Sequence, residues 1–171
     1  MSVSSKPPRA EARFDTALGA CGIAWSVGGV VGVRLPGDPG IPALPPLPGD
    51  RPAWLAVAVD GIQGLLAGQP ADLSRVPLDL GHVPPFSRRV LSAARFIPAG
   101  RTETYGSLAA MVGRPGAARA VGQAMARNPV PLLVPCHRVI GAWGCLGGFS
   151  GAGGVVTKQR LLDIEAGAAK R

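Results

Sequence analysis

The chain of 171 residues has few of the side chains that form covalent or metal cross-links. It contains three cysteines and two histidines. An odd, small number of cysteines argues against a disulfide framework and fits a reducing compartment. No Cys-x-x-Cys or His-x-x-x-His pair occurs, so neither residue type predicts a zinc site. We therefore expect no bound metal and no cofactor.

Long apolar runs are also missing. No uninterrupted stretch reaches the roughly 18 residues that indicate a membrane-spanning helix. The most apolar early segment, 20–35, is interrupted by serine and several glycines and lacks the layout of a signal peptide. Hydrophobic residues make up 47% of the chain, so a core can form. These features predict a soluble, cytoplasmic protein without a membrane partner.

Acidic residues are scarce in the second half of the chain. Residues 84–171 contain twelve Lys or Arg but only Glu103, Asp163 and Glu165, a net charge of +9, whereas residues 1–83 have a net charge of −1. A basic half joined to a nearly neutral half fits a polyanionic partner such as nucleic acid. Composition alone leaves open the alternative of a solvated, arginine-rich surface.

The first half predicts a small sheet with one helix. Segments 17–26 and 30–35 have the pattern of two strands joined by a tight turn at Gly28-Gly29. Apolar residues at helical spacing over 55–66 predict a helix that packs on this hairpin. A further strand is predicted over 73–80. Around these elements we expect irregular chain, namely a disordered tail over 1–12, a loop over 36–52 with seven prolines, and a linker over 82–85.

The second half predicts mostly helix. Residues 86–94 form one helical stripe, and helices over 105–112 and 117–127 flank a Gly/Pro turn in a helix-turn-helix pattern. Thr104 is the expected N-cap of the 105–112 helix, and Gly113 its C-terminal stop. In the 117–127 helix most side chains are Ala or Gly, which fits either close approach to a groove or tight helix packing.

The last helix is expected to run from Lys158 to about Ala166, with Thr157 as its cap. Leu161, Leu162 and Ile164 should pack inward. Glu165 lies near the C-terminal end, where the helix dipole does not favour a carboxylate. A specific role for Glu165 would explain this, although a solvent-facing glutamate is the commoner case.

The segment 135–139, Pro-Cys-His-Arg-Val, places a thiol beside an imidazole. The apolar run 132–134 before it predicts a short buried strand that stops at Pro135. A cysteine attacks as its thiolate, and a histidine can take the proton directly or through a water while a carboxylate fixes the histidine tautomer. Cys-His alone more often indicates a buried structural cysteine beside a hydrogen-bonded histidine, because free cysteine is among the most buried residue types.

Ordered motifs over about 86–165 resemble the O6-alkylguanine-DNA alkyltransferases, also called methylated-DNA–protein-cysteine methyltransferases. The motifs are Thr-Tyr-Gly at 104–106, Pro-Gly-Ala-Ala-Arg-Ala-Val-Gly at 115–122, Asn-Pro at 128–129, Pro-Cys-His-Arg-Val-Ile-Gly at 135–141 and Gly-Phe-Ser-Gly at 148–151. In the first half only the hairpin and the helix after it match in outline. The resemblance implies an α+β fold, with a ribonuclease H-like N-terminal domain over 1–83 and a winged-helix-like C-terminal domain over 84–171.

The activity implied by this resemblance is direct-reversal DNA repair. Such proteins bind duplex DNA from the minor groove, extrude an O6-alkylated guanine, and transfer its alkyl group irreversibly to a cysteine, once per molecule. By resemblance, Cys136 is the acceptor, His137 takes its proton through a water, Glu165 orients the histidine, and Asn128 ties the helix-turn-helix to the active-site loop. We accordingly expect the sulfur of Cys136 to be ionised, and Arg138 to be a structural ion-pair member.

The resemblance also implies residues that hold the substrate. Tyr105, Phe149, Ser150, Met125 and the backbone of Val139 would contact the extruded base. Arg119 would fill its place in the stack, where a planar cation can pair with the orphaned base. The remaining residues expected at the DNA are Thr104, Ala118, Ala120 and Gly122. The partner is double-stranded DNA carrying O6-alkylguanine, with O4-alkylthymine as a further substrate, and the protein is expected to be a monomer that could self-associate on DNA.

The chain departs from the family pattern at several points. The segment 151–154, Gly-Ala-Gly-Gly, is about two residues longer than in some relatives, which affects the lid over the pocket. Ser87 and Leu91 stand where relatives often have Gln and Trp. Of the zinc ligands that some relatives carry, Cys21 and His82 are the only candidates here. Cys21 and Cys145 are interpreted as structural or incidental.

Three other functions compete with alkyl transfer. A non-transferring lesion binder would keep Tyr105 and Arg119 but would not need Cys136. A cysteine hydrolase using Cys136 and His137 would turn over repeatedly. A transcription regulator would prefer one DNA sequence, which a helix made mainly of alanine is poorly suited to read.

Overall fold

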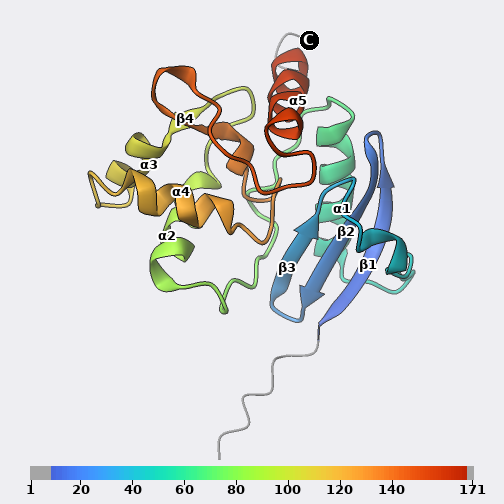
Figure 1. The fold of residues 1–171 in the computed structure, drawn as a ribbon. Coiled ribbons are helices and arrows are strands. Elements are labelled where there is room, and N and C mark those ends of the chain that lie inside the picture. Colours follow the sequence, from blue (N-terminus) through green and yellow to red (C-terminus); the bar gives the residue numbers. More distant parts are fainter. Residues whose placement is uncertain (1–8, 169–171) are drawn as a thin grey trace, which may run out of the picture.

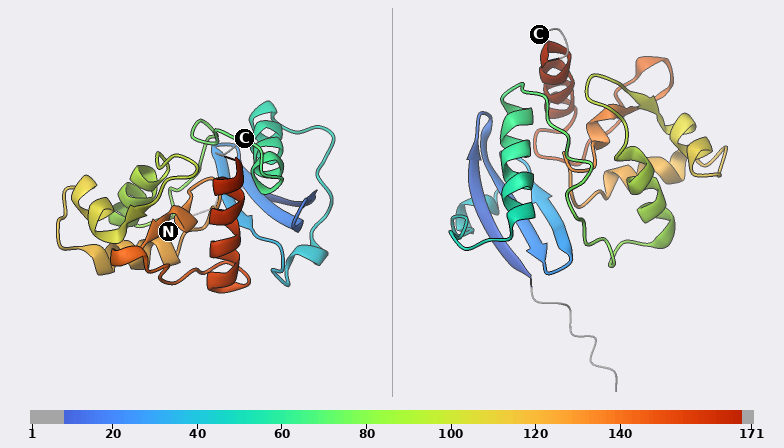
Figure 2. Two further views of the ribbon diagram at one scale, coloured as in Figure 1. Left: turned by 90° about the horizontal axis from the view of Figure 1, so that it is seen from above. Right: turned by 180° about the vertical axis from the view of Figure 1, so that it is seen from behind.

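The computed structural model describes residues 9–168 and has an α+β fold, as the sequence predicted (Figure 1). A sheet and helix α1 (Ala53–Leu66) come from the first half of the chain, and helices α2 to α5 come from the second. The C-terminal helix α5 returns to lie beside α1, so the two halves pack against each other (Figures 1 and 2).

The sheet has three antiparallel strands in sequence order: β1 (Ala10–Thr16), β2 (Gly19–Ser26) and β3 (Gly29–Arg34). Helix α1 covers one face of it (Figure 2). Leu55, Ile62 and Leu66 on α1 are buried together with Ile23 and Val30 of the sheet. The apolar face of an amphipathic helix and the apolar side of a pleated sheet thus form one core, which confirms the predicted hairpin and helix.

Two predictions in this half are wrong. Residues 10–12 of the expected tail begin β1, because Ala12 is buried and pairs with Ile23; residues 1–8 of that tail lie outside the described part of the chain. The predicted strand 73–80 is reduced to a bridge between Leu78 and Val30. Pro77 precedes that bridge and has no N–H with which to extend a ladder.

The turn between β2 and β3 depends on glycine. Gly29 has a φ of 140°, and a Cβ there would collide with the carbonyl of Pro77. That close approach lets the N–H of Val30 donate to the Pro77 carbonyl at 2.9 Å. The predicted loop 36–52 is irregular apart from the short 3₁₀ helix η1 (Ile41–Ala43).

The second half contains the predicted helices α2 (Pro85–Ala94), α3 (Tyr105–Met111) and α4 (Ala118–Ala126), which pack on one another. Thr104 caps α3 as expected, because its hydroxyl accepts a hydrogen bond from the N–H of Ser107 at 3.0 Å. Gly113, with a φ of 71°, follows the end of α3. Val121 and Met125 of α4 are buried, so the opposite side of this alanine-rich helix faces outward.

The segment that leads into the Cys-His motif differs from the prediction. Residues 132–134 are buried but form a turn instead of a strand, and Leu132 has a φ of 72°. A short apolar run does not distinguish a buried strand from a buried turn. The motif itself forms the 3₁₀ helix η2 (Cys136–Arg138) and continues into β5 (Val139–Ile140), which pairs in parallel with β4 (Glu103–Thr104). A second 3₁₀ turn, η3 (Ala142–Gly144), follows.

Helix α5 (Gly154–Ala168) begins about one turn earlier than predicted. Thr157 is therefore inside its first turn and is not the N-cap, and its hydroxyl donates to the carbonyl of Ala152 at 2.6 Å. Leu161 is buried, while Leu162 and Ile164 are half-buried. Because α5 packs against η2, Glu165 reaches the Cys-His motif. Within residues 9–168, none of the helices has the length and apolar character needed to cross a membrane.

Candidate active site

A cavity of about 950 Å³ opens beside Cys136. Its walls come from the start of α3, the outer side of α4 and the chain that follows β5. The lining residues are Thr104, Tyr105, Gly106, Ala118, Arg119, Gly122, Gln123, Met125, Ala126, Cys136, Ala142, Gly148, Phe149 and Ser150. The structure thus gathers most of the predicted site residues around one space of the size that binds a small organic group.

Cys136 lies at the inner wall of this cavity and is 5% exposed. Burial raises the pKa of its thiol, and the hydrogen bond to Asn128 and the positive charge of Lys158 oppose that rise only in part. The resting site therefore holds a protonated thiol, not the ionised sulfur that we expected. Desolvation of the anion is the physical reason, and a base has to remove the proton before the sulfur can attack.

A buried ionic group lies behind the thiol. The ring of His137 is inaccessible to solvent, and its Nε2 is 2.7 Å from Oε1 of Glu165. Arg138 donates to both oxygens of the same carboxylate, with Nη2 to Oε1 at 2.7 Å and Nε to Oε2 at 3.0 Å. Arg138 also donates from Nη1 to the Ile97 carbonyl at 2.5 Å. The expected ion pair of Arg138 is therefore present, and the Glu165 carboxylate is shared by His137, Arg138 and the N–H of Gly100, which donates to Oε2 at 3.3 Å.

These contacts determine the protonation of the group. Burial alone would raise the pKa of Glu165, but hydrogen bonds from His137 and Arg138 and their charges lower it to about 2. Burial lowers the pKa of His137, so its imidazole is neutral at pH 7. A carboxylate can only accept, so Nε2 of the neutral ring is the nitrogen that carries the hydrogen.

The other ring nitrogen of His137 is left to act as an acceptor. Its Nδ1 is buried and has no hydrogen-bond partner among the described residues. A buried unpaired acceptor is costly, and such atoms occur where chemistry requires them. An imidazole with a free lone pair at Nδ1 and a carboxylate at Nε2 is arranged to accept a proton and to stabilise the cation that results.

Asn128 connects the helix-turn-helix to the segment before Cys136. Its Nδ2 donates to the Val134 carbonyl at 2.9 Å, and its Oδ1 accepts from the N–H of Val130 at 3.1 Å. Both bonds are buried, and the side chain also reaches the Cys136 thiol. Asn128 therefore lies at the junction between α4 and the turn that leads into Cys136.

Lys158 is a site residue that the sequence analysis missed. It is fully buried, and its Nζ donates to the carbonyls of Val139 at 2.6 Å, of Leu146, and of Gly148 at 3.5 Å. Burial lowers the pKa of Lys158, whereas the charge on Cys136 would raise it. Lys158 shares the inward stripe of α5 with Leu161 and Glu165, and a lysine on an inward stripe was the available signal.

Some predicted site residues lie away from the cavity lining. His137, Glu165 and Asn128 are buried and are not among the residues that line the cavity. Val139 lies outside the lining set, and its carbonyl accepts the Lys158 ammonium. Ala120 is exposed on the outer side of α4 beside exposed Arg119. The structure therefore separates an inner group around the sulfur from an outer, helix-borne surface.

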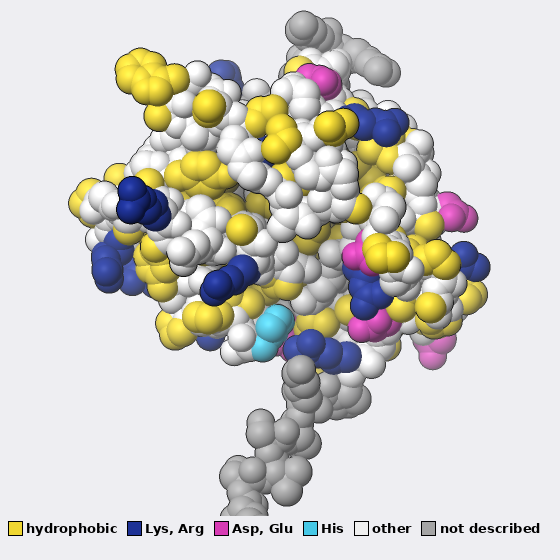
Figure 3. Space-filling view, viewed as in Figure 1, with side chains coloured by type: hydrophobic (Ala, Val, Ile, Leu, Met, Phe, Trp, Pro, Cys, Tyr) yellow, Lys and Arg dark blue, Asp and Glu magenta, His cyan; other side chains and the backbone are white. Residues whose placement is uncertain are grey.

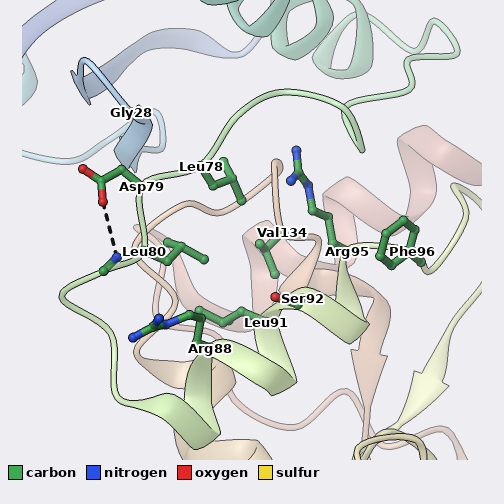
Figure 4. Close-up of a pocket in the computed structure, with 11 residues that line it drawn as sticks. Gly28, Leu78, Asp79, Leu80, Arg88, Leu91, Ser92, Arg95, Phe96 and Val134 are labelled. Atoms are coloured by element: carbon green, nitrogen blue, oxygen red, sulfur yellow. Dashed lines mark hydrogen bonds between the residues drawn. The ribbon is translucent and has the colours of Figure 1, made fainter.

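A second cavity, of about 550 Å³, lies between α2 and the chain that joins the two halves (Figure 4). Its wall includes Arg88 and Ser92 of α2, Arg95 just after that helix and Asp79 of the joining chain, with Phe96 at its edge. Arg95 donates to the carbonyls of Leu73 and Val76 and so attaches the joining chain to α2. This cavity contains no cysteine or histidine, so it does not offer the chemistry of the first.

Charge is distributed unequally over the surface. On the face shown in Figure 3, Lys and Arg side chains over the helical half stand apart from acids, whereas over the sheet they are interspersed with Asp and Glu. No group of three or more His, Cys, Asp or Glu side chains that could hold a metal occurs in the part of the chain that is described. Among the residues that line the Cys136 cavity, Arg119 of α4 is charged, and its neighbours Ala118, Gly122 and Ala126 are small.

The fold and the site together define a helix-turn-helix protein with a buried cysteine, backed by a histidine–carboxylate pair, at a cavity bordered by the second helix of that motif. Comparisons with known proteins agree. Residues 85–167 match the family model described as "6-O-methylguanine DNA methyltransferase, DNA binding domain". The methylated-DNA–protein-cysteine methyltransferase of Mycolicibacterium paratuberculosis is 45% identical over 116 residues, which cover 68% of each chain. The enzyme of that name from Salmonella typhimurium is 48% identical over 106 residues, 62% of this chain and 60% of its own.

Solved structures extend the likeness to nearly the whole chain. The structure of Mycobacterium tuberculosis OGT in complex with DNA has a TM-score of 0.76 and 36% identity, covering 93% of this chain and 94% of that one. The O6-methylguanine-DNA methyltransferase of Pyrococcus kodakaraensis has a TM-score of 0.58 and 28% identity, covering 92% and 99%. The chain belongs to the methylated-DNA–protein-cysteine methyltransferase family.

Proposed function

We propose that this protein repairs DNA by direct reversal, moving the alkyl group of O6-alkylguanine from duplex DNA to the sulfur of Cys136. Membership of the family supports the reaction class. The observation that supports the assignment to this sulfur is the position of Cys136 at the wall of the large cavity, with the buried His137–Glu165 pair behind it.

The chemical step is a displacement at the alkyl carbon. His137 accepts the thiol proton at Nδ1, through a water, and the resulting imidazolium is stabilised by the Glu165 carboxylate. The sulfur then forms a bond to the alkyl carbon while the bond from that carbon to O6 breaks. The guanine leaves and takes up a proton. The thioether product has no proton to lose and is a much weaker nucleophile than a thiolate, so each molecule reacts once.

Base extrusion explains why the sulfur lies in a cavity. The alkyl carbon of a stacked guanine cannot be reached inside a duplex, so the nucleotide must leave the stack. Tyr105, Met125, Phe149 and Ser150 line the space that would receive it. In this proposal Phe149 provides an aromatic face for the base, while Tyr105, Ser150 and the Val139 backbone provide hydrogen bonds.

Helix α4 is the proposed DNA-contacting element. Ala118, Ala120 and Gly122 give its outer side little bulk, which suits the narrow minor groove, and Thr104 lies at the adjoining cavity wall. Arg119 is exposed and also lines the cavity, so its guanidinium can enter the gap that the extruded base leaves. Phosphate contacts by the basic half would make affinity fall as salt rises.

The organisation of the protein is part of the same proposal. We divide the chain into an N-terminal domain over 1–83 and a catalytic, DNA-binding domain over 84–171. We propose that it acts in the cytoplasm as a monomer, with self-association along DNA as the alternative that sedimentation on long duplexes would reveal. O4-alkylthymine is proposed as a second substrate.

Intact-mass measurement tests the function. After incubation with duplexes that contain O6-methylguanine or O6-benzylguanine, the protein should gain one methyl or one benzyl group, and peptide mapping should place it on Cys136. Tight binding with unchanged mass would favour the non-transferring lesion binder instead. Release of more than one product per protein would favour a cysteine hydrolase.

A further inference from the structure

Trp143 has a position that neither the core nor the turn explains. Its side chain is fully exposed, at 103%, although large aromatic residues are normally well buried. Its φ of 61° and ψ of 23° lie in the left-handed region, where Gly or Asn is favoured. The chain thus has tryptophan, the bulkiest residue type, at a position where the side chain gains no stabilisation from burial and where the backbone conformation disfavours it.

The turn that carries Trp143 is held by several hydrogen bonds. The N–H of Gly141 donates to the carbonyl of Cys145 at 2.6 Å, and the N–H of Cys145 donates to the carbonyl of Ala142 at 3.3 Å. Lys158 fixes the two ends of the loop, because its ammonium binds the carbonyls of Val139 before it and Leu146 after it. A ring on such a pre-ordered turn loses little conformational entropy when it binds a partner.

The loop lies at the mouth of the Cys136 cavity. Ala142, the neighbour of Trp143, lines that cavity together with Arg119 of α4. The loop projects from the upper left of the molecule in Figure 1, and a hydrophobic side chain stands clear of the surface there in Figure 3. Residues 139–157 contain no charged side chain, so nothing in this segment repels a polyanion.

We propose that Trp143 is a DNA contact, whose indole face packs on the nucleotides that flank the extruded guanine. This rests on the proposed function, since the partner is the duplex that α4 holds. Extrusion leaves neighbouring bases and sugars partly uncovered, and an indole offers a flat apolar surface to cover them. Trp143 thus favours the extruded state from the loop side of the cavity, while Arg119 acts from the helix side.

The test compares substitutions of Trp143 in protein that carries Cys136→Ser, so that binding is measured without reaction. Trp143→Ala removes the ring at a position with left-handed backbone. Trp143→Asn also removes the ring, but asparagine tolerates that backbone conformation. Trp143→Phe keeps an aromatic face. We expect Ala and Asn to weaken binding to an O6-methylguanine duplex roughly tenfold, within the range for loss of base–aromatic stacking. Trp143→Phe should stay within about threefold.

The matched control is Val27→Ala, because Val27 is 93% exposed on the turn between β2 and β3, away from the cavity. It should leave the Kd unchanged, and melting temperatures should be the same for all variants. Unchanged DNA affinity in Trp143→Ala overturns the proposal.

A reaction with the free base O6-benzylguanine separates this proposal from the proposed function, because it needs the cavity but no duplex. With Cys136 intact, Trp143→Ala should take up benzyl at the native rate. Equal slowing with free base and duplex would place the ring in the cavity and overturn a DNA contact. If the native protein takes up no alkyl group from either substrate, the proposed function fails, while the binding comparison still decides the role of Trp143.

Discussion

Two buried thiols in this protein have different surroundings. Cys21 lies in the sheet, is fully buried, and pairs across the strands with Phe14. Burial raises its pKa to about 12, and a hydrogen bond to Thr16 only partly opposes that rise. Cys136 is almost as buried, and burial raises its pKa too. Burial therefore does not distinguish a structural thiol from a reactive one.

The neighbours make the difference. The neighbours of Cys136 are the Asn128 amide, the Lys158 ammonium, the His137 imidazole with its free acceptor nitrogen, and an open cavity. Among the described residues, Cys21 has none of these neighbours. A buried thiol is unreactive until a group nearby can take its proton and a substrate can reach it. Each prediction below replaces one of the two thiols or a charged group near Cys136.

The largest effect should come from replacing the sulfur itself. Cys136→Ser should abolish alkyl transfer, since a serine hydroxyl with no stronger base than His137 is a far poorer nucleophile, yet the variant should still bind alkylated duplex. Cys21→Ser is the matched control and should retain full transfer. Intact mass after reaction measures both, and an alkyl group found on Cys21 in native protein would break the comparison.

Loss of the carboxylate behind the histidine should come next. Glu165→Gln removes the charge that stabilises the imidazolium, so the thiol should lose its proton less readily and its apparent pKa should rise. We expect transfer at pH 7 to slow about a hundredfold, in the range for a general base that is impaired. Single-turnover rates measured against pH should shift to higher pH, and a profile that coincides with that of the native protein would remove Glu165 from the mechanism.

The same carboxylate should make folding sensitive to acid. Its pKa is about 2 in the folded protein and roughly 4.3 in an unfolded chain, so its contribution is complete above the unfolded value. Stability should fall as pH drops from about 4 toward 2, by up to roughly 3 kcal/mol from this group. Urea unfolding at several pH values measures the slope, which should flatten over that window in Glu165→Gln.

Replacing Lys158, which binds the loop after Cys136, should have a smaller effect on transfer. Lys158→Met keeps the length of the side chain but leaves the carbonyls of Val139 and Leu146 without their donor, at a cost of about 1–3 kcal/mol. It also removes a cation that favours the thiolate. Transfer should slow about tenfold, on the order of the 1.4 kcal/mol that a factor of ten represents. Arg160→Met on the exposed side of α5 is the control and should match the native rate.

The elements and site residues of this protein differ in how far the sequence could predict them. Helices α1 to α4 have regular apolar spacing, the hairpin has its Gly28-Gly29 turn, and α3 has a clear N-cap in Thr104, so these patterns were sufficient. Glu165 was connected to Cys136 and His137 only through resemblance, because nothing local in the sequence brings residues 28 positions apart into contact. Lys158 was overlooked although it lies on the inward stripe of α5, because that pattern does not identify its partners, which are backbone carbonyls. Strand β1 and the turn 132–134 were misread because their structure is set by what packs against them.

The smallest effect on activity should follow from Cys21→Ala, which tests the other half of the comparison. Removing one sulfur from a packed core should lower the free energy of unfolding by about 1 kcal/mol. Transfer to Cys136 should be unchanged, because Cys21 lies in strand β2 and is not among the residues that line the Cys136 cavity. Denaturant unfolding and single-turnover transfer, measured on the same preparation, check the two expectations. A slower transfer with native stability would mean that the sheet influences the reactive sulfur through the packing of α1 against α5, and the two regions could then no longer be treated as independent.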